Sequence, residues 1–204
     1  MALLFAKNNS LSAVTALPAA VSGGGLTLIS TSTASGVNAI NITSGIDSTY
    51  KEYIFKLINI HASGDQQFLI NFSTDGGSNY NVSKTATYWG YLHQEDDAQA
   101  LSYNNASADI GNSTSAFNIS RGVSTNNDDN CSGTIHLYDP SSTVFVKHFL
   151  TQYNEQNNTP GINQTLSAGY ANTTSAINAM TFQCSAGTFD GIIKMYGISK
   201  SWVH

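Results

Sequence analysis

Residues 133–152 constrain the fold more than any other stretch of this 204-residue chain, because they contain two strand-like runs around a turn. In the first run, Ile135 and Leu137 alternate with polar or aromatic neighbours, which is the period of two that a β-strand requires. The turn, Asp139–Ser142, contains a proline that fixes φ and an aspartate whose side chain can bond to nearby backbone. The stretch therefore predicts a β-hairpin.

The second run of this hairpin carries apolar side chains on both faces. Phe145 and Phe149 share one face with Lys147, and aliphatic residues share the other face with His148. A strand with two apolar faces is typical of a position between two covering layers. We therefore expect Phe145 to be buried in the core.

The chain is weakly charged and moderately apolar. A hydrophobic fraction of 41% argues against disorder, and 204 residues are enough to bury one sizeable core. Only 10% of the residues are charged, against roughly 25% in an average soluble domain. The polar surface must consequently be built from Asn, Ser, Thr, Gly and Gln, which offer neutral hydrogen bonds to hydroxyl-rich ligands.

The charge and the hydropathy of the chain argue against a nucleic-acid partner and against a membrane span. The net charge is −5 and no basic run occurs, so we expect no nucleic-acid partner. No stretch approaches the ~18 apolar residues of a spanning helix, so we expect no membrane span. The apolar start, residues 1–6, is too short for the core of a signal peptide.

Strand-like runs recur along the rest of the chain. Residues 50–61 form the longest apolar run, and their aromatic and β-branched content favours a strand with Phe55 in the core. Residues 68–72 alternate in the same way, and residues 189–198 form a further run near the end. Amphipathic stretches with helix caps are missing from the sequence. The pattern predicts an all-β fold, an antiparallel β-sandwich that is jelly-roll-like.

Residues 73–80 resemble an Asp-box turn in which Asn79 replaces the usual threonine. In such a turn the aspartate, here Asp75, caps backbone amides, and glycine adopts a positive φ. Asp-box turns occur in sialidases and in many proteins that are not enzymes. We expect a purely structural role here.

The first 36 residues differ from the rest of the chain. Three consecutive glycines, residues 23–25, form a flexible joint, and the apolar residues before them are too many for a solvated tail. We predict an extended N-terminal docking arm at 1–36 and a β-sandwich domain at 37–204. The alternative is that the segment supplies the first strand of the same domain. The predicted partner-docking residues are Leu3, Leu4, Phe5, Leu11 and Leu17.

An aromatic cluster and a carboxylate cluster follow one another in the middle of the chain. The aromatic rings could form a sugar-binding platform, and the carboxylates could bind calcium or hydrolyse a glycosidic bond. The alternative is a solvated loop beside core aromatics. The aromatic residues are Tyr88, Trp89 and Tyr91, and the carboxylates are Glu95, Asp96 and Asp97.

The histidines and the cysteines are further candidates for a chemical role. His136 and His148 lie on opposite arms of the predicted hairpin and could bind a metal, although cross-strand packing is the simpler interpretation. Cys131 and Cys184 could pair, but we expect two free thiols, with Cys184 packed in the core. Because no nucleophile elbow or other catalytic constellation occurs, we predict that the protein is not an enzyme and needs no cofactor beyond the calcium alternative.

Four segments of the sequence form a recurrent set: residues 42–53, 72–80, 136–142 and 189–198. They resemble small β-rich virion proteins of tailed bacteriophages, especially marine ones. The resemblance spans about residues 38–198, and residues 7–14 look like the attachment end of such proteins.

This resemblance implies a structural protein at the virion surface, assembled in the host cytoplasm and contacting other virion proteins. We expect a tail-fibre or adhesion subunit that forms a homotrimer and contacts a host surface glycan. A capsid decoration protein is the first alternative, and a glycan-cleaving enzyme is the second.

Overall fold

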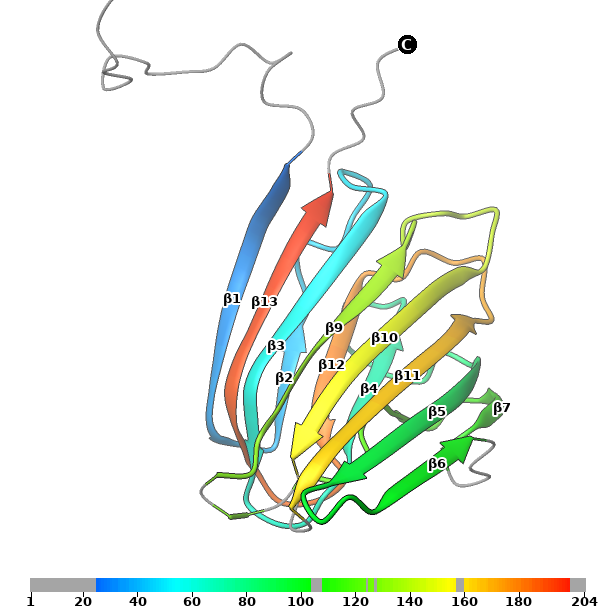
Figure 1. Cartoon of the computed structure of the whole chain (residues 1–204). Coiled ribbons are helices and arrows are strands. Elements are labelled where there is room, and N and C mark those ends of the chain that lie inside the picture. The colour runs from blue at the N-terminus through cyan, green and yellow to red at the C-terminus, as the bar shows by residue number, and fades with distance from the viewer. Residues whose placement is uncertain (1–24, 104–107, 124, 127, 157–159, 199–204) are drawn as a thin grey trace, which may run out of the picture.

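The computed structural model describes residues 25–103, 108–123, 125–126, 128–156 and 160–198 (Figure 1). These residues form thirteen strands and no helix, which confirms the all-β prediction. The strands are β1 (Leu26–Val37), β2 (Ala39–Ile42), β3 (Glu52–Ala62), β4 (Phe68–Ser73), β5 (Lys84–Gln94), β6 (Gln99–Tyr103), β7 (Ile110–Ser113), β8 (Phe117–Asn118), β9 (Cys131–Tyr138), β10 (Lys147–Gln156), β11 (Gly161–Ala171), β12 (Ala179–Cys184) and β13 (Phe189–Ile198).

The strands build two antiparallel sheets that pack face to face (Figure 1). The larger sheet has nine strands in the order β1-β13-β3-β9-β10-β11-β5-β6, with β7 paired to β5. The smaller sheet has four strands in the order β2-β12-β4-β8. Because the smaller sheet lies against only one face of the larger one, the other face of the larger sheet is left towards solvent.

The connectivity is that of a jelly roll with two insertions. The order β1-β13-β3-β9 in one sheet and β2-β12-β4-β8 in the other sends the chain back and forth between the sheets, as in two linked Greek keys. One insertion, β5–β7, lies between β4 and β8, and the second, β10–β11, lies between β9 and β12. Both insertions join the larger sheet beyond β9 and widen it on that side.

Aromatic side chains from both sheets join the two layers. Phe55 on β3 is fully buried and its ring centroid lies 5.5 Å from that of Phe182 on β12. Phe72 on β4 packs in the same way against Phe149 on β10, at 5.3 Å. Such pairs are favourable beyond the area they bury, so the core runs between the sheets and under β10. The predicted burial of Phe55 is confirmed.

The predicted burial of Phe145 is wrong. Its side chain is 69% exposed, because β10 begins only at Lys147 and the connection from β9 covers residues 139–146. The hydroxyl oxygen of Ser142 accepts hydrogen bonds from the amides of Val144 and Phe145, at 3.2 and 3.0 Å. This local bonding extends the turn at the expense of the strand ladder.

The second correction to this hairpin concerns its layers. Along β10, buried and exposed residues alternate strictly, and the outward side chain of Leu150 is 43% exposed. Within the part of the chain that the structure describes, the strand is therefore covered on one face only. The apolar residues that suggested a second covering layer lie in the turn or at the solvent face.

Part of the predicted docking arm belongs to the sandwich. Strand β1 pairs with β13 along most of its length, so the predicted boundary between residues 36 and 37 falls inside an integral strand. The alternative, a first strand of the same domain, is therefore correct for residues 26–36, because β13 offers a free edge for backbone pairing. The docking residues Leu3, Leu4, Phe5, Leu11 and Leu17 lie outside the described residues.

The two cysteines are free thiols, as expected. Cys184 is buried in the core, and Cys131 is buried as well. The thiol of Cys131 donates to the backbone carbonyl of Ile60 and also lies beside the hydroxyl of Tyr153. Burial raises the pKa of the Cys131 thiol well above its ordinary value, so it is held in the protonated form.

Candidate functional site

The outer face of the larger sheet carries the candidate site. Along β5, alternate residues point to opposite sides, so Ala86 and Tyr88 face the core while Thr85, Thr87 and Trp89 face solvent. On the neighbouring strands, β11 and β10, the even-numbered positions face the same way. This face is left uncovered by the smaller sheet (Figure 1).

The predicted aromatic platform is divided by this alternation. Tyr88 is only 3% exposed, and its backbone amide donates to the carboxylate of Asp109, so it cannot contact a ligand at the surface. Trp89 is 40% exposed, and Tyr91 also faces outward, with its hydroxyl donating to Gln99. Residues 88 and 89 are adjacent in a strand, which is why all three rings cannot share one face.

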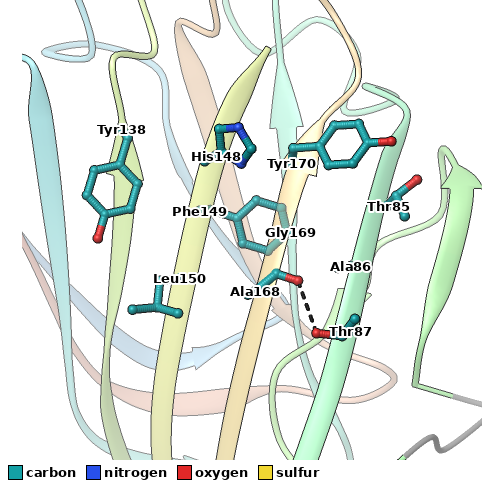
Figure 2. A pocket seen from close by; sticks show the side chains of 10 residues that line it. All are labelled: Thr85, Ala86, Thr87, Tyr138, His148, Phe149, Leu150, Ala168, Gly169 and Tyr170. Atoms are coloured by element: carbon teal, nitrogen blue, oxygen red, sulfur yellow. Dashed lines mark hydrogen bonds between the residues drawn. The ribbon is translucent and has the colours of Figure 1, made fainter.

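A shallow hollow of about 500 Å³ lies on the outer face, over Ala168 of β11 (Figure 2). Ala168 is opposite Leu150 on β10 and opposite Thr87 on β5. Its outward neighbour along β11 is Tyr170, which is also much larger. A small side chain among larger ones leaves a depression in an otherwise filled surface, and this is the local origin of the hollow.

The wall of the hollow combines aromatic rings with polar groups. His148 on β10 lies opposite Tyr170, with ring centroids 6.1 Å apart, and Tyr138 at the end of β9 adds another ring (Figure 2). On the β5 side, Thr85 and Thr87 contribute hydroxyls. The Thr87 hydroxyl donates to the carbonyl of Ala168 at 3.4 Å and retains lone pairs that can accept a hydrogen bond.

The floor of the hollow is apolar and packed closely against the core. Gly169 follows Ala168 and faces the core, and the ring of Phe149 packs so closely beneath it that a Cβ there would lie 2.5 Å from that ring. The floor therefore consists of the Ala168 methyl group, the side of Leu150 and backbone supported from below by Phe149. Such a floor offers contact area and no hydrogen bond.

A histidine–carboxylate pair lies on the strands beside the hollow. His136 of β9 is opposite Leu150, and its Nδ1 is 2.6 Å from a carboxylate oxygen of Glu52 on β3. Among the described residues that line the hollow there is no Asp, Glu, Lys or Arg. The site is therefore suited to an uncharged ligand with both apolar and hydroxyl-bearing surfaces.

The two histidines that could have shared a metal have separate partners. His136 bonds to Glu52, whereas His148 packs against Tyr170. The described part of the chain contains no group of three or more His, Cys, Asp or Glu side chains placed to hold a metal ion. Both histidines thus make the cross-strand contacts of the simpler interpretation, and these contacts do not test metal binding.

The predicted calcium residues Glu95, Asp96 and Asp97 are exposed in the connection between β5 and β6. Asp96 accepts a hydrogen bond from the amide of Ala98, and Asp97 lies 3.5 Å from the imidazole of His93. These contacts shape the turn. Calcium binding by these carboxylates stays an untested alternative to the solvated loop.

The Asp-box-like turn has the expected geometry. A carboxylate oxygen of Asp75 accepts hydrogen bonds from the Ser73 hydroxyl and the Asn79 amide, at 2.6 and 2.9 Å. Gly76 and Gly77 have φ angles of 74° and 89°, which favour glycine. These hydrogen bonds lower the pKa of Asp75 to about 2, so the carboxylate is a charged structural anchor for the turn.

The sequence alone did not reveal the hollow. Its lining residues come from β5, β10 and β11, and the register that brings them together is set by long-range pairing. One local signal was present: outward positions of β11 read Ile162, Gln164, Leu166, Ala168 and Tyr170, with one small residue among larger ones. That signal becomes informative only once the outward face is known.

Neither a protein-family model nor a curated protein matches this chain. Within the described residues, no helix is long and apolar enough to cross a membrane.

Proposed function

We propose that the protein is a surface component of a tailed-phage virion, a fibre or adhesion subunit that binds a host surface glycan. The observation that carries the proposal is the hollow on the outer sheet face, where aromatic rings, hydroxyls and an imidazole surround an apolar floor. The jelly-roll sandwich and the sequence resemblance to phage virion proteins are consistent with this role.

A carbohydrate matches the chemistry of this face. A sugar ring presents apolar C–H faces and hydroxyl edges together, and the hollow offers Tyr138 and Tyr170 for the former and Thr85 and Thr87 for the latter. Because few side chains of this chain are charged, few strongly hydrated groups compete with an uncharged sugar for hydrogen bonds at the surface. Weak binding at one hollow becomes firm when several copies engage one cell surface, because the local concentration of sites is high.

Self-association is part of the proposal. Strand β1 is an edge strand of twelve residues without a charge, and its outward Leu26 and Leu28 are exposed. Long uncharged edges are prone to pair with another chain. We propose a homotrimer that covers such edges and joins other virion proteins through the segment before β1. Light scattering that finds a monomer at micromolar concentration would refute this for the isolated protein.

The second candidate is a decoration protein that stabilises the capsid. The same exposed edge favours it, since Leu26 and Leu28 could lie against a shell protein instead of another copy. The two locations are separated by labelling intact particles with an antibody against the sandwich. Label on tails supports the adhesion subunit, and label on heads supports the decoration protein.

Glycan binding is tested with the purified full chain and host cells. Fluorescently labelled protein should bind the cells, and mild periodate oxidation of the cell-surface sugars should abolish the binding. Binding that survives oxidation would assign the host contact to another class of molecule.

A further inference from the structure

We infer that the hollow over Ala168 receives a methyl group of a neutral sugar, either an acetamido methyl or the methyl of a 6-deoxy sugar. This inference rests on the proposed glycan-binding function and goes beyond it by naming the part of the sugar that enters. It follows from three properties of the hollow: its floor, its rim and its charge.

The floor selects against hydroxyl groups. It is formed by the Ala168 methyl, the side chain of Leu150 and backbone held over the ring of Phe149. A sugar hydroxyl pressed onto this floor would lose its hydrogen bonds to water without gaining replacements, which is unfavourable. A methyl group in the same place loses nothing and removes apolar surface from water.

The polar side chains at the rim of the hollow can contact the rest of the sugar ring. Thr85 and Thr87 on β5 and His148 on β10 stand at the sides of the hollow, within reach of the hydroxyls that flank an inserted methyl group (Figure 2). The Tyr170 ring, packed beside His148, supplies an apolar wall. Polar contacts thus surround an apolar centre, which orients a ligand that has one methyl group among several hydroxyls.

The charge of the surroundings points to a neutral ligand. No Lys or Arg side chain lines the described hollow, and the whole chain carries a net charge of −5. The imidazole of His136, on the neighbouring strand, is already hydrogen-bonded to the carboxylate of Glu52 at 2.6 Å. A sugar carboxylate or phosphate would therefore find no counter-charge and would be repelled by the protein as a whole.

The test uses saturation-transfer NMR on the full chain with four free sugars. Two carry a methyl group, N-acetylglucosamine and fucose, and two do not, glucose and galactose. We expect the methyl protons to receive the strongest saturation. We also expect at least one methyl-bearing sugar to bind about fourfold or more tightly than both controls, as burial of a methyl group predicts. The stronger of the first two identifies the source of the methyl group.

Two substitutions connect binding to the hollow. Ala168→Leu fills the depression at an exposed position, so it should abolish the methyl signal while leaving the thermal unfolding transition nearly unchanged. Leu150→Ser replaces one apolar wall by a hydroxyl and should weaken the methyl-bearing sugars selectively. The matched control is Gln152→Leu, on the same face of β10 but outside the lining, which should bind as the parent does.

The outcomes separate this inference from the proposed function. If host-cell binding is abolished by periodate but glucose and galactose bind as well as the methyl-bearing sugars, the inference is wrong and the glycan-binding proposal stands. If neither cells nor sugars bind, both fail. If Ala168→Leu changes the oligomeric state measured by light scattering, the hollow is an interface between copies, which also overturns the inference.

Discussion

Glu155 on β10 and Asn163 on β11 lie directly opposite each other on the inner face of the larger sheet, and each is only 1% exposed. One carboxylate oxygen of Glu155 accepts hydrogen bonds from the amides of Arg121 and Gly122, at 2.7 and 3.1 Å. Its other oxygen has no partner among the described residues, and neither does either polar atom of the Asn163 amide. Burial raises the pKa of this carboxyl to about 8.

The raised pKa predicts a pH dependence of stability. The unfolded chain releases the Glu155 proton near pH 4.5, whereas the folded chain retains it until about pH 8. The folded state therefore binds the extra proton inside this window, and stability falls as pH rises through it. Replacing Glu155 by glutamine removes the titration. As pH rises between these limits, the unfolding free energy of the variant should increase relative to that of the parent by a few kcal/mol. The expected size follows from about 1.4 kcal/mol per pKa unit.

Urea denaturation at several pH values from 5 to 9 measures this difference. Other ionisable or charged groups near the site are present in both proteins, so their effects largely cancel in the comparison. They are Tyr88, Cys131, Tyr153, Arg121 and Asp65. Parallel stability profiles for the two proteins would show that Glu155 is ionised throughout the window.

A pair of phenylalanine substitutions tests where the core lies. Phe55→Ala should cost about 3–5 kcal/mol of unfolding free energy, since a fully buried ring leaves a cavity between the sheets. Phe145→Ala should change stability by less than about 0.5 kcal/mol, because its ring is mostly in solvent. Chemical denaturation of both variants is sufficient. Equal losses would mean that the β9–β10 turn folds back onto the core.

The sequence was informative wherever a feature depends on neighbouring residues. Alternation in the second run of the hairpin, up to residue 152, predicts a strand, and it also places Lys147 on the face of Phe149, where it is indeed buried. The composition of the turn at Asp75 likewise predicted its hydrogen bonds. These features follow from backbone geometry over a few residues.

What could not be predicted depends on long-range pairing or on small energy differences. The β9–β10 turn is longer than predicted because the Ser142 hydroxyl accepts hydrogen bonds from the following amides. These local hydrogen bonds compete with the backbone pairing that would extend the strand. The insertion of β5 beside β11, which assembles the hollow, joins residues far apart in the chain. No local pattern distinguishes that arrangement from another strand order.

The Asp75 turn gives a prediction at acidic pH. Because its folded-state pKa is lowered from 3.8 to about 2, the carboxylate stabilises the fold at neutral pH, and this contribution is lost as pH falls through that range. Asp75→Asn should therefore lower the urea midpoint at pH 7, and the difference from the parent should shrink below pH 4. A difference that persists unchanged at pH 2 would mean that shape, and not charge, is what the turn requires.

Two deletions test the division between the N-terminal segment and the sandwich. Removing residues 1–25 leaves β1 intact, so we expect a folded, soluble protein that no longer joins the particle. Removing residues 1–37 deletes β1 and leaves the edge of β13 unpaired, which should cause aggregation or unfolding. Circular dichroism and particle sedimentation measure the two properties.

If the shorter deletion also aggregates, the first 25 residues are required for the sandwich itself and the docking role is wrong. If it folds and still joins the particle, attachment resides elsewhere on the surface.

Apart from Tyr138, the residues that line the hollow stand on β5, β10 and β11, which are the strands inserted into the jelly roll. Their outward side chains share no packing with the aromatic pairs that hold the sheets together, because alternation sends the two sets to opposite sides. We therefore expect that substitutions of the exposed Ala168 or Leu150 leave the packing between the sheets unchanged. Under the proposed role as a phage adhesion subunit, substitutions at a few outward positions would alter which host glycans are bound while the framework stays unchanged.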